Sequence, residues 1–511
     1  MNETVETFLR LNAENDIDGM VRYTREGIGR PDVLVHAVYY LILTGKLRPA
    51  YVVAMLLANA RIENPAISVA LAVGGLTFGN AEEETRGRNL LRAQVDQSDA
   101  VPWAEFYREV LEPVFRRLLE APLLAANQNQ VLRILEILQE GVPNFRTMFD
   151  RQASAPPLTL DALRRRGQGS ARLVDYPSPP AGIARPARRA VVAVRELFFP
   201  DMPWSRPLDL GPRLVAGMAA YGWQASFHGM KWSDQRVDYQ GIVEFCRQQQ
   251  AELLILDDNM IEATSIRPAR AAMIALLRRE LPSLKIVSIL FDTWSIEPAL
   301  LKECLADVDC IWETTSPSLS VWQDPVFAGR LLHMQVPHAG NACPPVPPLR
   351  PSFSFRGGVM GYNWHRAFWL AAADALGLPI DKTLSSHATD GLSALDSYTL
   401  YMQQLAQAPC SLNLSMRSDL SCIVTGRCFE TIITGSLLVQ EATPDMDYYF
   451  VSGEHYLSFS SLAELKAVID FIDKNRDEAD AIRHRGNAFA RERYSDDKII
   501  GYLDKALFYP G

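Results

Sequence analysis

Between residues 189 and 338, short apolar runs rich in β-branched residues alternate with segments in which apolar residues recur every three or four positions. The runs are AVVAVREL, QASFHG, AELLILDD, KIVSILFD, DCIWETT and LLHMQVPH. A parallel sheet covered by helices produces this alternation, because its strands are buried on both faces. The pattern therefore predicts a Rossmann-like α/β domain over residues 189–338.

A second series of the same kind follows a proline-rich stretch. Residues 339–352, AGNACPPVPPLRPS, cannot continue a helix or a sheet and are predicted to form a stiff connector. The runs SFSFRGGVMGY, SLNLS, LLVQE and YLSFSS predict a second Rossmann-like domain with return helices over residues 353–511. Ligands of open α/β sheets bind at the carboxyl ends of the strands, so a cleft between the two domains is expected to hold the ligand. We expect the connector to act as a hinge and the last helices to pack back on the first domain.

The amino-terminal part has a different periodicity. Residues 1–150 read as helices throughout, with prolines 31, 49 and 65 at helix starts and Gly45, Asn64 and Gly79 at helix ends. The short, regular spacing of these breaks predicts an all-helical, repeat-like domain. Residues 151–188 are rich in Pro, Ser, Gly and Arg and are predicted to be a linker.

Composition excludes several classes of protein. A net charge of -9 lacks the basic surface of a nucleic-acid-binding protein. The seven cysteines are odd in number and form no C-x-x-C pair, which argues against a disulfide framework and a zinc site. The sequence shows no apolar run of the ~18 residues needed to cross a bilayer, and no signal-peptide pattern. We therefore expect a cytoplasmic protein without a transmembrane segment.

The most informative stretch is VTGRCFETIITGSLLVQE, residues 424–441. A loop with Thr425, Gly426 and Arg427 opens a helix that begins near Cys428, and the strand LLVQE follows. The start of a helix offers N–H groups and a positive dipole end, and Arg427 adds a planar cation, so the stretch suits a diphosphate. Glu430 could accept hydrogen bonds from a ribose diol. The alternative is a structural i,i+3 ion pair between Arg427 and Glu430 on the surface.

Residues 398–494 resemble the carboxyl-terminal domain of glycosyltransferases of the GT-B fold, in particular spore-maturation-type or family-1-like glycosyltransferases. The matching segments are SYTLYMQQLAQAPCSLNLS, then GRCFETIITGSLLVQEATPDMDYYFVSGEHYLSFSSLAELKAVIDFI, and ADAIRHRGNAFARERYS. The resemblance implies two Rossmann-like domains in the GT-B arrangement. It also implies that Arg427 contacts the diphosphate of a nucleotide sugar and that Glu430 contacts the nucleotide ribose.

One position departs from this pattern. Many retaining enzymes of this fold carry two glutamates eight positions apart, but Cys422 stands eight residues before Glu430. The departure leaves the stereochemical outcome open. A second donor-binding candidate is the loop FRGGVMGYNWHR. Its Gly357, Gly358 and Gly361 could admit a phosphate, with His365 and Arg366 beside it, although glycines before a helix also serve turns.

Candidates for the general base lie in the first domain. Asp292 in LFDTW and His228 in FHGMKW are expected at strand ends, as are Asp257 and Asp258, and either type of group could deprotonate an acceptor hydroxyl. Asp292 is preferred, and His338 is read as a turn residue. No Asp-x-Asp segment stands where it would hold a metal–diphosphate, so we expect no obligatory metal ion and no cofactor.

These observations favour a glycosyltransferase that uses a nucleotide sugar. Two alternatives stay open: a nucleotide-sugar epimerase of the same fold, and a non-catalytic nucleotide-sugar-binding or adaptor protein. Stacked helices make extended concave surfaces, so the helical domain favours a protein acceptor or self-assembly into a homo-oligomer. A glycan acceptor also stays open.

Overall fold

The computed structural model describes most of the chain outside one long central segment. The described residues are 3–43, 47–62, 64, 65–78, 80–96, 173–180, 187–198, 206–233, 236–259, 261, 266–293, 296–339, 352–357, 366, 369–370, 373, 378–383, 391–415, 423–460 and 462–509.

The amino-terminal part is helical, as expected. Between residues 3 and 96 it forms α1 (Glu3–Ala13), α2 (Ile17–Gly27), α3 (Pro31–Leu43), α4 (Leu47–Asn59), α5 (Pro65–Phe78) and α6 (Ala81–Asp96). Pro31 and Pro65 begin their helices, and Pro49 is the third residue of α4. Asn64, expected at a helix end, instead accepts a hydrogen bond from the Ala66 amide (2.9 Å) and so caps the start of α5. Gly45 and Gly79 lie outside the described residues.

The first α/β unit, residues 187–339, contains a six-stranded parallel sheet in the order β10-β9-β8-β7-β1-β4. Its strands are β1 (Arg189–Arg195), β4 (Gln224–Met230), β7 (Leu253–Asp257), β8 (Lys285–Leu290), β9 (Cys310–Glu313) and β10 (Leu331–His333). Its helices are α13 (Leu210–Tyr221), α14 (Tyr239–Gln248), α15 (Arg267–Glu280) and α16 (Pro298–Leu305). Two small hairpins, β2 (Leu197–Phe198) with β3 (Arg206–Pro207) and β5 (Trp232–Ser233) with β6 (Arg236–Val237), lie outside this sheet.

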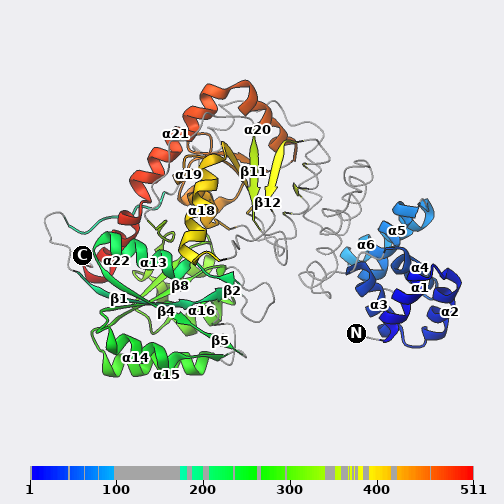
Figure 1. Ribbon diagram of the computed structural model, residues 1–511, viewed down its shortest axis with the longest axis horizontal. Helices are drawn as coiled ribbons and strands as arrows, with labels where there is room; N and C mark the ends of the chain where they lie inside the picture. The colour runs from blue at the N-terminus through cyan, green and yellow to red at the C-terminus, as the bar shows by residue number, and fades with distance from the viewer. Residues whose placement is uncertain are drawn as a thin grey trace.

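Successive residues of β1 face two different apolar cores, one on each side of the sheet, which explains its continuous apolar sequence. Val192 and Val194 pack with Leu214 of α13, whereas Val191 and Ala193 pack with the residues of α14 and α15. Figure 1 shows α13 on one side of this sheet and α14 and α15 on the other. The sheet is thus doubly wound, and the expectation of a Rossmann-like unit is confirmed.

The second α/β unit, residues 352–509, contains a five-stranded parallel sheet in the order β12-β11-β13-β14-β15. Its strands are β11 (Phe353–Arg356), β12 (Ile380–Thr383), β13 (Cys410–Asn413), β14 (Leu437–Glu441) and β15 (Leu457–Phe459). Its helices are α18 (Ala394–Gln407), α19 (Gly426–Ile433), α20 (Leu462–Lys474), α21 (Arg476–Arg493) and α22 (Asp496–Phe508). A 3₁₀ turn, η7 (Pro444–Tyr448), lies in this unit, and two others, η4 (Ser320–Gln323) and η5 (Pro325–Phe327), lie in the first unit.

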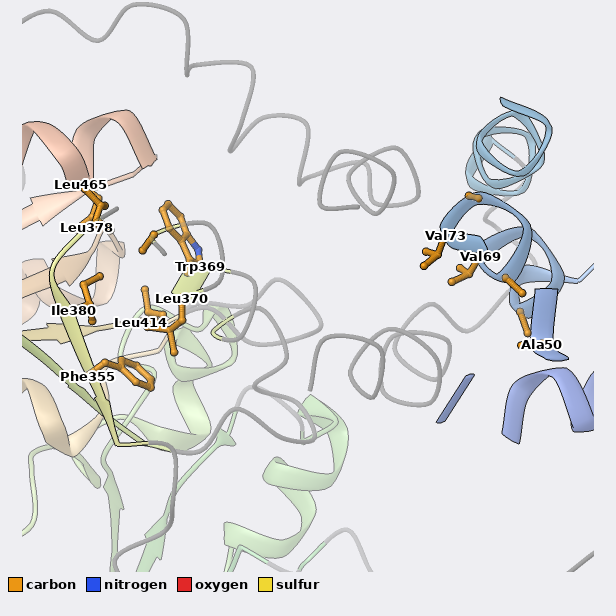
Figure 2. Packing of buried hydrophobic residues seen from close by; sticks show 14 of the residues in the cluster. Ala50, Val69, Val73, Phe355, Trp369, Leu370, Leu378, Ile380, Leu414 and Leu465 are labelled. Atoms are coloured by element: carbon orange, nitrogen blue, oxygen red, sulfur yellow. The ribbon is translucent and has the colours of Figure 1, made fainter. Parts of the chain in front are cut away.

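Apolar residues of the second sheet and its helices pack together on one face of this sheet. Figure 2 shows Phe355 and Ile380 from neighbouring strands, with Leu414, Trp369 and Leu465 beside them. The Trp369 ring meets the Phe459 ring edge-on, with 5.3 Å between the centroids. The strand order reverses between β11 and β13, and doubly wound sheets bind ligands at the carboxyl ends of strands at such a point.

The last helix returns to the first unit. Helix α22 packs on α13, where Asp504 accepts hydrogen bonds from Tyr221 Oη (3.3 Å) and from Arg188 Nε (2.9 Å). Helix α21 stays with the second unit, where the Asn487 amide donates to the carbonyls of Ile432 and Ile433 (2.9 Å each). The expected return of the chain to the first unit is thus made by α22.

The fold class expected from the sequence, two Rossmann-like units preceded by helices, is confirmed. The boundaries expected at residues 150, 188, 338 and 352 stay predictions, since residues 97–172 and 340–351 lie outside the described part. Within the described part, no helix combines the length and apolar character that a bilayer crossing requires.

Candidate functional site

Helix α19 begins at the carboxyl edge of the second sheet. Thr425 precedes it in an extended conformation (φ -87°, ψ 152°), and its hydroxyl accepts a hydrogen bond from the Asn413 side chain at the end of β13 (3.2 Å). The Val424 amide donates across the units to the Thr315 carbonyl (2.8 Å). The first turn of α19, with Gly426, therefore lies at the carboxyl edge of the second sheet and next to the first unit, where its dipole favours an anion.

The Arg427 side chain lies against the end of β11. A methyl group on Gly357 would stand 2.7 Å from Arg427 Nη1 and 2.8 Å from Nη2, so a glycine is required for this approach. The guanidinium carbon is 5.9 Å from the centre of the Phe355 ring, and the Tyr401 side chain is hydrogen-bonded to Arg427. Nε and Nη1 are buried and have no hydrogen-bond partner among the described residues. Two donors of a cation thus have no partner among the described residues at the point where the strand order reverses.

Glu430 is buried at the contact between the two units. Its Oε1 lies 3.2 Å from Nη1 of Arg213 on α13, and its Oε2 accepts a hydrogen bond from Tyr401 Oη (3.1 Å). The ion partner of Glu430 among the described residues is thus Arg213 and not Arg427, which differs from the surface i,i+3 pair considered as an alternative. Burial raises the pKa of the Tyr401 hydroxyl, and the Glu430 carboxylate raises it further, so Tyr401 is a neutral donor.

A network of buried polar groups supports the start of α19. The Asn413 side-chain amide donates to Gln440 Oε1 (2.7 Å), and the Ser415 backbone amide donates to Glu441 Oε2 (2.7 Å). Burial raises the pKa of the Cys428 thiol to about 11, so this side chain packs as a neutral group in contact with Asn413. The network fixes the carboxyl ends of β13 and β14 relative to α19.

A second polar cluster joins the units on the side of β9 and β10. Glu313, fully buried, accepts hydrogen bonds from the Thr315 and Ser316 amides (2.8 and 2.6 Å) and lies 3.1 Å from Nδ1 of His333. In the second unit, Asp445 accepts a hydrogen bond from the Ser318 amide (2.9 Å). Burial raises the pKa of Asp445 to about 6, although its hydrogen bond to Ser318 opposes the shift.

Comparison with known proteins identifies the second unit. Residues 354–503 match the family model described as glycosyl transferase-like. This unit is a glycosyl transferase-like domain. The resemblance that residues 398–494 carry is thereby confirmed. No curated protein matches the chain.

Solved structures similar to this chain are distant in sequence. Alr3699/HepE from Anabaena, solved in complex with UDP and glucose, is 10% identical over 63% of this chain and 99% of its own, with a TM-score of 0.41. Sucrose-phosphate synthase from Thermosynechococcus elongatus is 11% identical over 63% and 100%, with a TM-score of 0.40. An O-GlcNAc transferase from Thermobaculum terrenum is 14% identical over 94% and 97%, with a TM-score of 0.36.

The structure describes only some of the other residues that were expected at the donor site. Arg366 is buried, and its Nε donates to the Leu414 carbonyl just beyond β13 (3.2 Å), so it lies near the carboxyl end of β13 in the glycosyl transferase-like domain. Gly361 and His365, predicted beside it, lie outside the described residues, as does Gly358.

The two base candidates occupy different places in the first unit. Asp292 follows β8 at the carboxyl edge and has a positive φ of 51°, which is uncommon for a residue other than glycine. His228 lies within β4 rather than at its end. Its ring is 5.1 Å from the Phe245 ring of α14, on a face that helices cover, and burial lowers its pKa. The strand-end position expected for His228 is therefore corrected.

The remaining polar candidates form structural contacts. Asp257 pairs with Arg195 (2.7 Å), and Asp258 pairs with the buried Arg270 (2.7 Å). His338 is buried, with Nδ1 3.4 Å from Tyr398 Oη, and burial lowers its pKa. No group of three or more His, Cys, Asp or Glu side chains within the described residues is arranged to hold a metal ion.

Sequence reasoning missed Arg213 and Tyr401, which both contact the glutamate of the glycosyl transferase-like domain. A signal for Arg213 exists in hindsight, because it is the single charged residue of the otherwise apolar helix LGPRLVAGMAAY. A charge on a buried helix requires partners. Asp209, four residues earlier, is one of them, but the sequence does not say that the other is Glu430.

Proposed function

We propose that this chain is a glycosyltransferase that moves a sugar from a nucleotide-sugar donor to an acceptor hydroxyl, with the donor diphosphate bound beside Arg427. The observation that carries the proposal is the Arg427 side chain, which lies against Gly357 with Nε and Nη1 unpartnered among the described residues. Buried donors without partners are costly, and the planar fork of a guanidinium fits phosphate oxygens. The match of this unit to a glycosyl transferase-like family supports the same chemistry.

In the proposed reaction, the acceptor oxygen bonds to the anomeric carbon as the bond from that carbon to the diphosphate oxygen breaks. The nucleoside diphosphate leaves with the bonding electrons, and the acceptor proton passes to a base. Arg427 and the first turn of α19, with Thr425 and Gly426, stabilise the charge that develops on the diphosphate. We assign no metal ion to this step, because the cation and the helix dipole supply the positive charge.

Further roles are proposed for the remaining candidates. Glu430 is proposed to accept hydrogen bonds from the ribose hydroxyls, and Gly361, His365 and Arg366 are proposed, from the sequence of their loop, to contact the donor. Asp292 is the preferred base, because it stands at the carboxyl edge of the first sheet in a strained backbone conformation. His228, whose ring packs against Phe245 of α14, is not retained as a base. The acceptor is proposed to be a protein or a glycan.

The test is calorimetric titration with a panel of nucleoside diphosphates, using the parent chain and Arg427→Gln. We expect one nucleoside diphosphate to bind more tightly than its monophosphate. Losing hydrogen bonds from a charged group costs about 1.5–3 kcal/mol, so the variant should bind roughly tenfold to a hundredfold more weakly. Arg279→Gln is the control, since Arg279 is exposed on α15 of the first unit. If the parent binds no nucleoside diphosphate, or if Arg427→Gln binds as tightly as the parent, the proposal fails.

The two alternatives are separated by product analysis with a panel of nucleotide sugars. A transferase releases the nucleoside diphosphate when an acceptor is present. An epimerase converts the nucleotide sugar with no acceptor, and a binding protein leaves it unchanged. The absence of a glutamate at Cys422 keeps the binding protein under consideration.

A further inference from the structure

The ion pair between Arg213 and Glu430 spans the two α/β units. The Arg213 guanidinium lies in an enclosed site made by four segments. Nη1 is 3.3 Å from Asp209 Oδ2 and 3.2 Å from Glu430 Oε1, and Nε donates to the Pro337 carbonyl (3.0 Å). The guanidinium carbon is 3.9 Å above the centre of the Tyr398 ring. One side chain thus joins α13, the segment that leaves the first unit, α18 and α19.

This arrangement restricts access to the Glu430 carboxylate. One of its oxygens contacts Arg213, and the other accepts the hydrogen bond from Tyr401. The Glu430 side chain is only 8% exposed and that of Arg213 only 12%. A ribose diol that approaches from solvent therefore finds this carboxylate covered, and the ion partner on Oε1 belongs to the opposite unit.

We infer that Arg213 is an interdomain latch: it holds Glu430 in the nucleotide-free protein, and nucleotide binding exchanges this ion pair for hydrogen bonds to ribose. The inference rests on the proposed function, because that function supplies the ribose. While the latch is closed, the carboxylate cannot take a ligand. The measured affinity for nucleotide is then the intrinsic affinity reduced by the fraction of molecules in which the latch is open.

Two amide hydrogen bonds report the state of the latch without any ligand. Val424 donates to the Thr315 carbonyl (2.8 Å), and Ser318 donates to Asp445 Oδ1 (2.9 Å), both between the units. The Ile286 amide, which donates to Asp309 within the first unit, is the internal reference. Separation of the units exposes the first two amides to exchange and leaves the third protected.

The experiment combines hydrogen exchange and nucleoside-diphosphate binding for the parent chain, Arg213→Gln and Glu430→Gln. Both variants break the ion pair, so exchange at Val424 and Ser318 should rise about tenfold or more in each, while Ile286 is unchanged. Nucleotide affinity should move in opposite directions. It should rise at least severalfold in Arg213→Gln, which uncovers the carboxylate, and fall in Glu430→Gln, which removes it.

The outcomes separate the latch from the proposed function. Unchanged exchange at both interdomain amides in Arg213→Gln overturns the latch. Weaker nucleotide binding by Arg213→Gln also overturns it, because Arg213 would then position the carboxylate for the ligand. If exchange rises in the variants but the parent chain binds no nucleotide, the interdomain contact is supported and the proposed donor site is ruled out. If Arg213→Gln fails to fold, Arg213→Lys takes its place. This variant keeps the charge but loses the planar guanidinium, so amide exchange and nucleotide affinity must change in the same directions by smaller amounts.

Discussion

Replacing Asp445 by asparagine should stabilise the protein at neutral pH and leave its stability unchanged in acid. Asp445 is buried beside Glu313 and His333, and burial raises its pKa from 3.8 to about 6. Between these two values the folded protein binds more protons than the unfolded chain. Its free energy of unfolding therefore falls as the pH rises through this window.

The size of the effect follows from the shift. A difference of roughly two pKa units corresponds to about 3 kcal/mol of unfolding free energy, lost in full above pH ~6. The amide side chain of Asp445→Asn cannot ionise, yet its oxygen could still accept the hydrogen bond from the Ser318 amide. The variant should therefore match the parent near pH ~4 and exceed it by up to about 3 kcal/mol at pH ~7.5.

Urea denaturation followed by tryptophan fluorescence at several pH values between about 4 and 8 measures this difference. Thr443→Ala is the control, since Thr443 caps the same 3₁₀ turn through the Asp445 amide (3.3 Å) and does not titrate. Its effect on the free energy of unfolding should not follow the same pH window. A constant difference between Asp445→Asn and the parent across this range, or a variant that loses stability relative to the parent as the pH rises, refutes the reasoning.

Three further predictions concern close contacts and metal dependence. Gly357→Ala should displace the Arg427 guanidinium, which stands 2.7 Å from the new methyl group, and weaken nucleoside-diphosphate binding in calorimetry. Gly486→Ala should lower the free energy of unfolding by about 1–3 kcal/mol, because its methyl group would stand 2.2 Å from the His455 carbonyl oxygen, whereas Gly501→Ala, 3.4 Å from its nearest neighbour, should be tolerated. Chelation by EDTA should leave sugar transfer unchanged; inhibition that added metal reverses would contradict the metal-free reaction.

The sequence predicts the strands that carry an apolar run, including the edge strands β4, β10 and β15, and misses the strand that lacks one. β7 and β14 are buried throughout, so their sequences LLILD and LLVQE are rich in apolar residues and identify them. β12 lies at the edge of the second sheet and has the sequence IDKT, which lacks such a run. Its burial and pairing are properties of the assembled sheet, so no local pattern predicted it.

The candidate site was likewise predicted only where neighbouring residues along the chain determine its structure. The start of α19 depends on neighbouring residues, and the helix was expected near Cys428 and is observed from Gly426. The partner of Glu430 depends on how two units meet, so Arg213 could not be assigned from its own segment. His228 was misplaced because β4 continues to Met230, two residues beyond it.

The return of α22 to the first unit has a consequence for synthesis. A ribosome releases α13 long before α22, yet Tyr221 of α13 donates a hydrogen bond to Asp504 of α22. Domains generally fold in the order in which they emerge, but here the first α/β unit stays incomplete until α22 has left the ribosome. A chain cut short before residue 496 would therefore damage the first α/β unit, and nascent chains should expose the apolar surface of α13 until α22 has emerged.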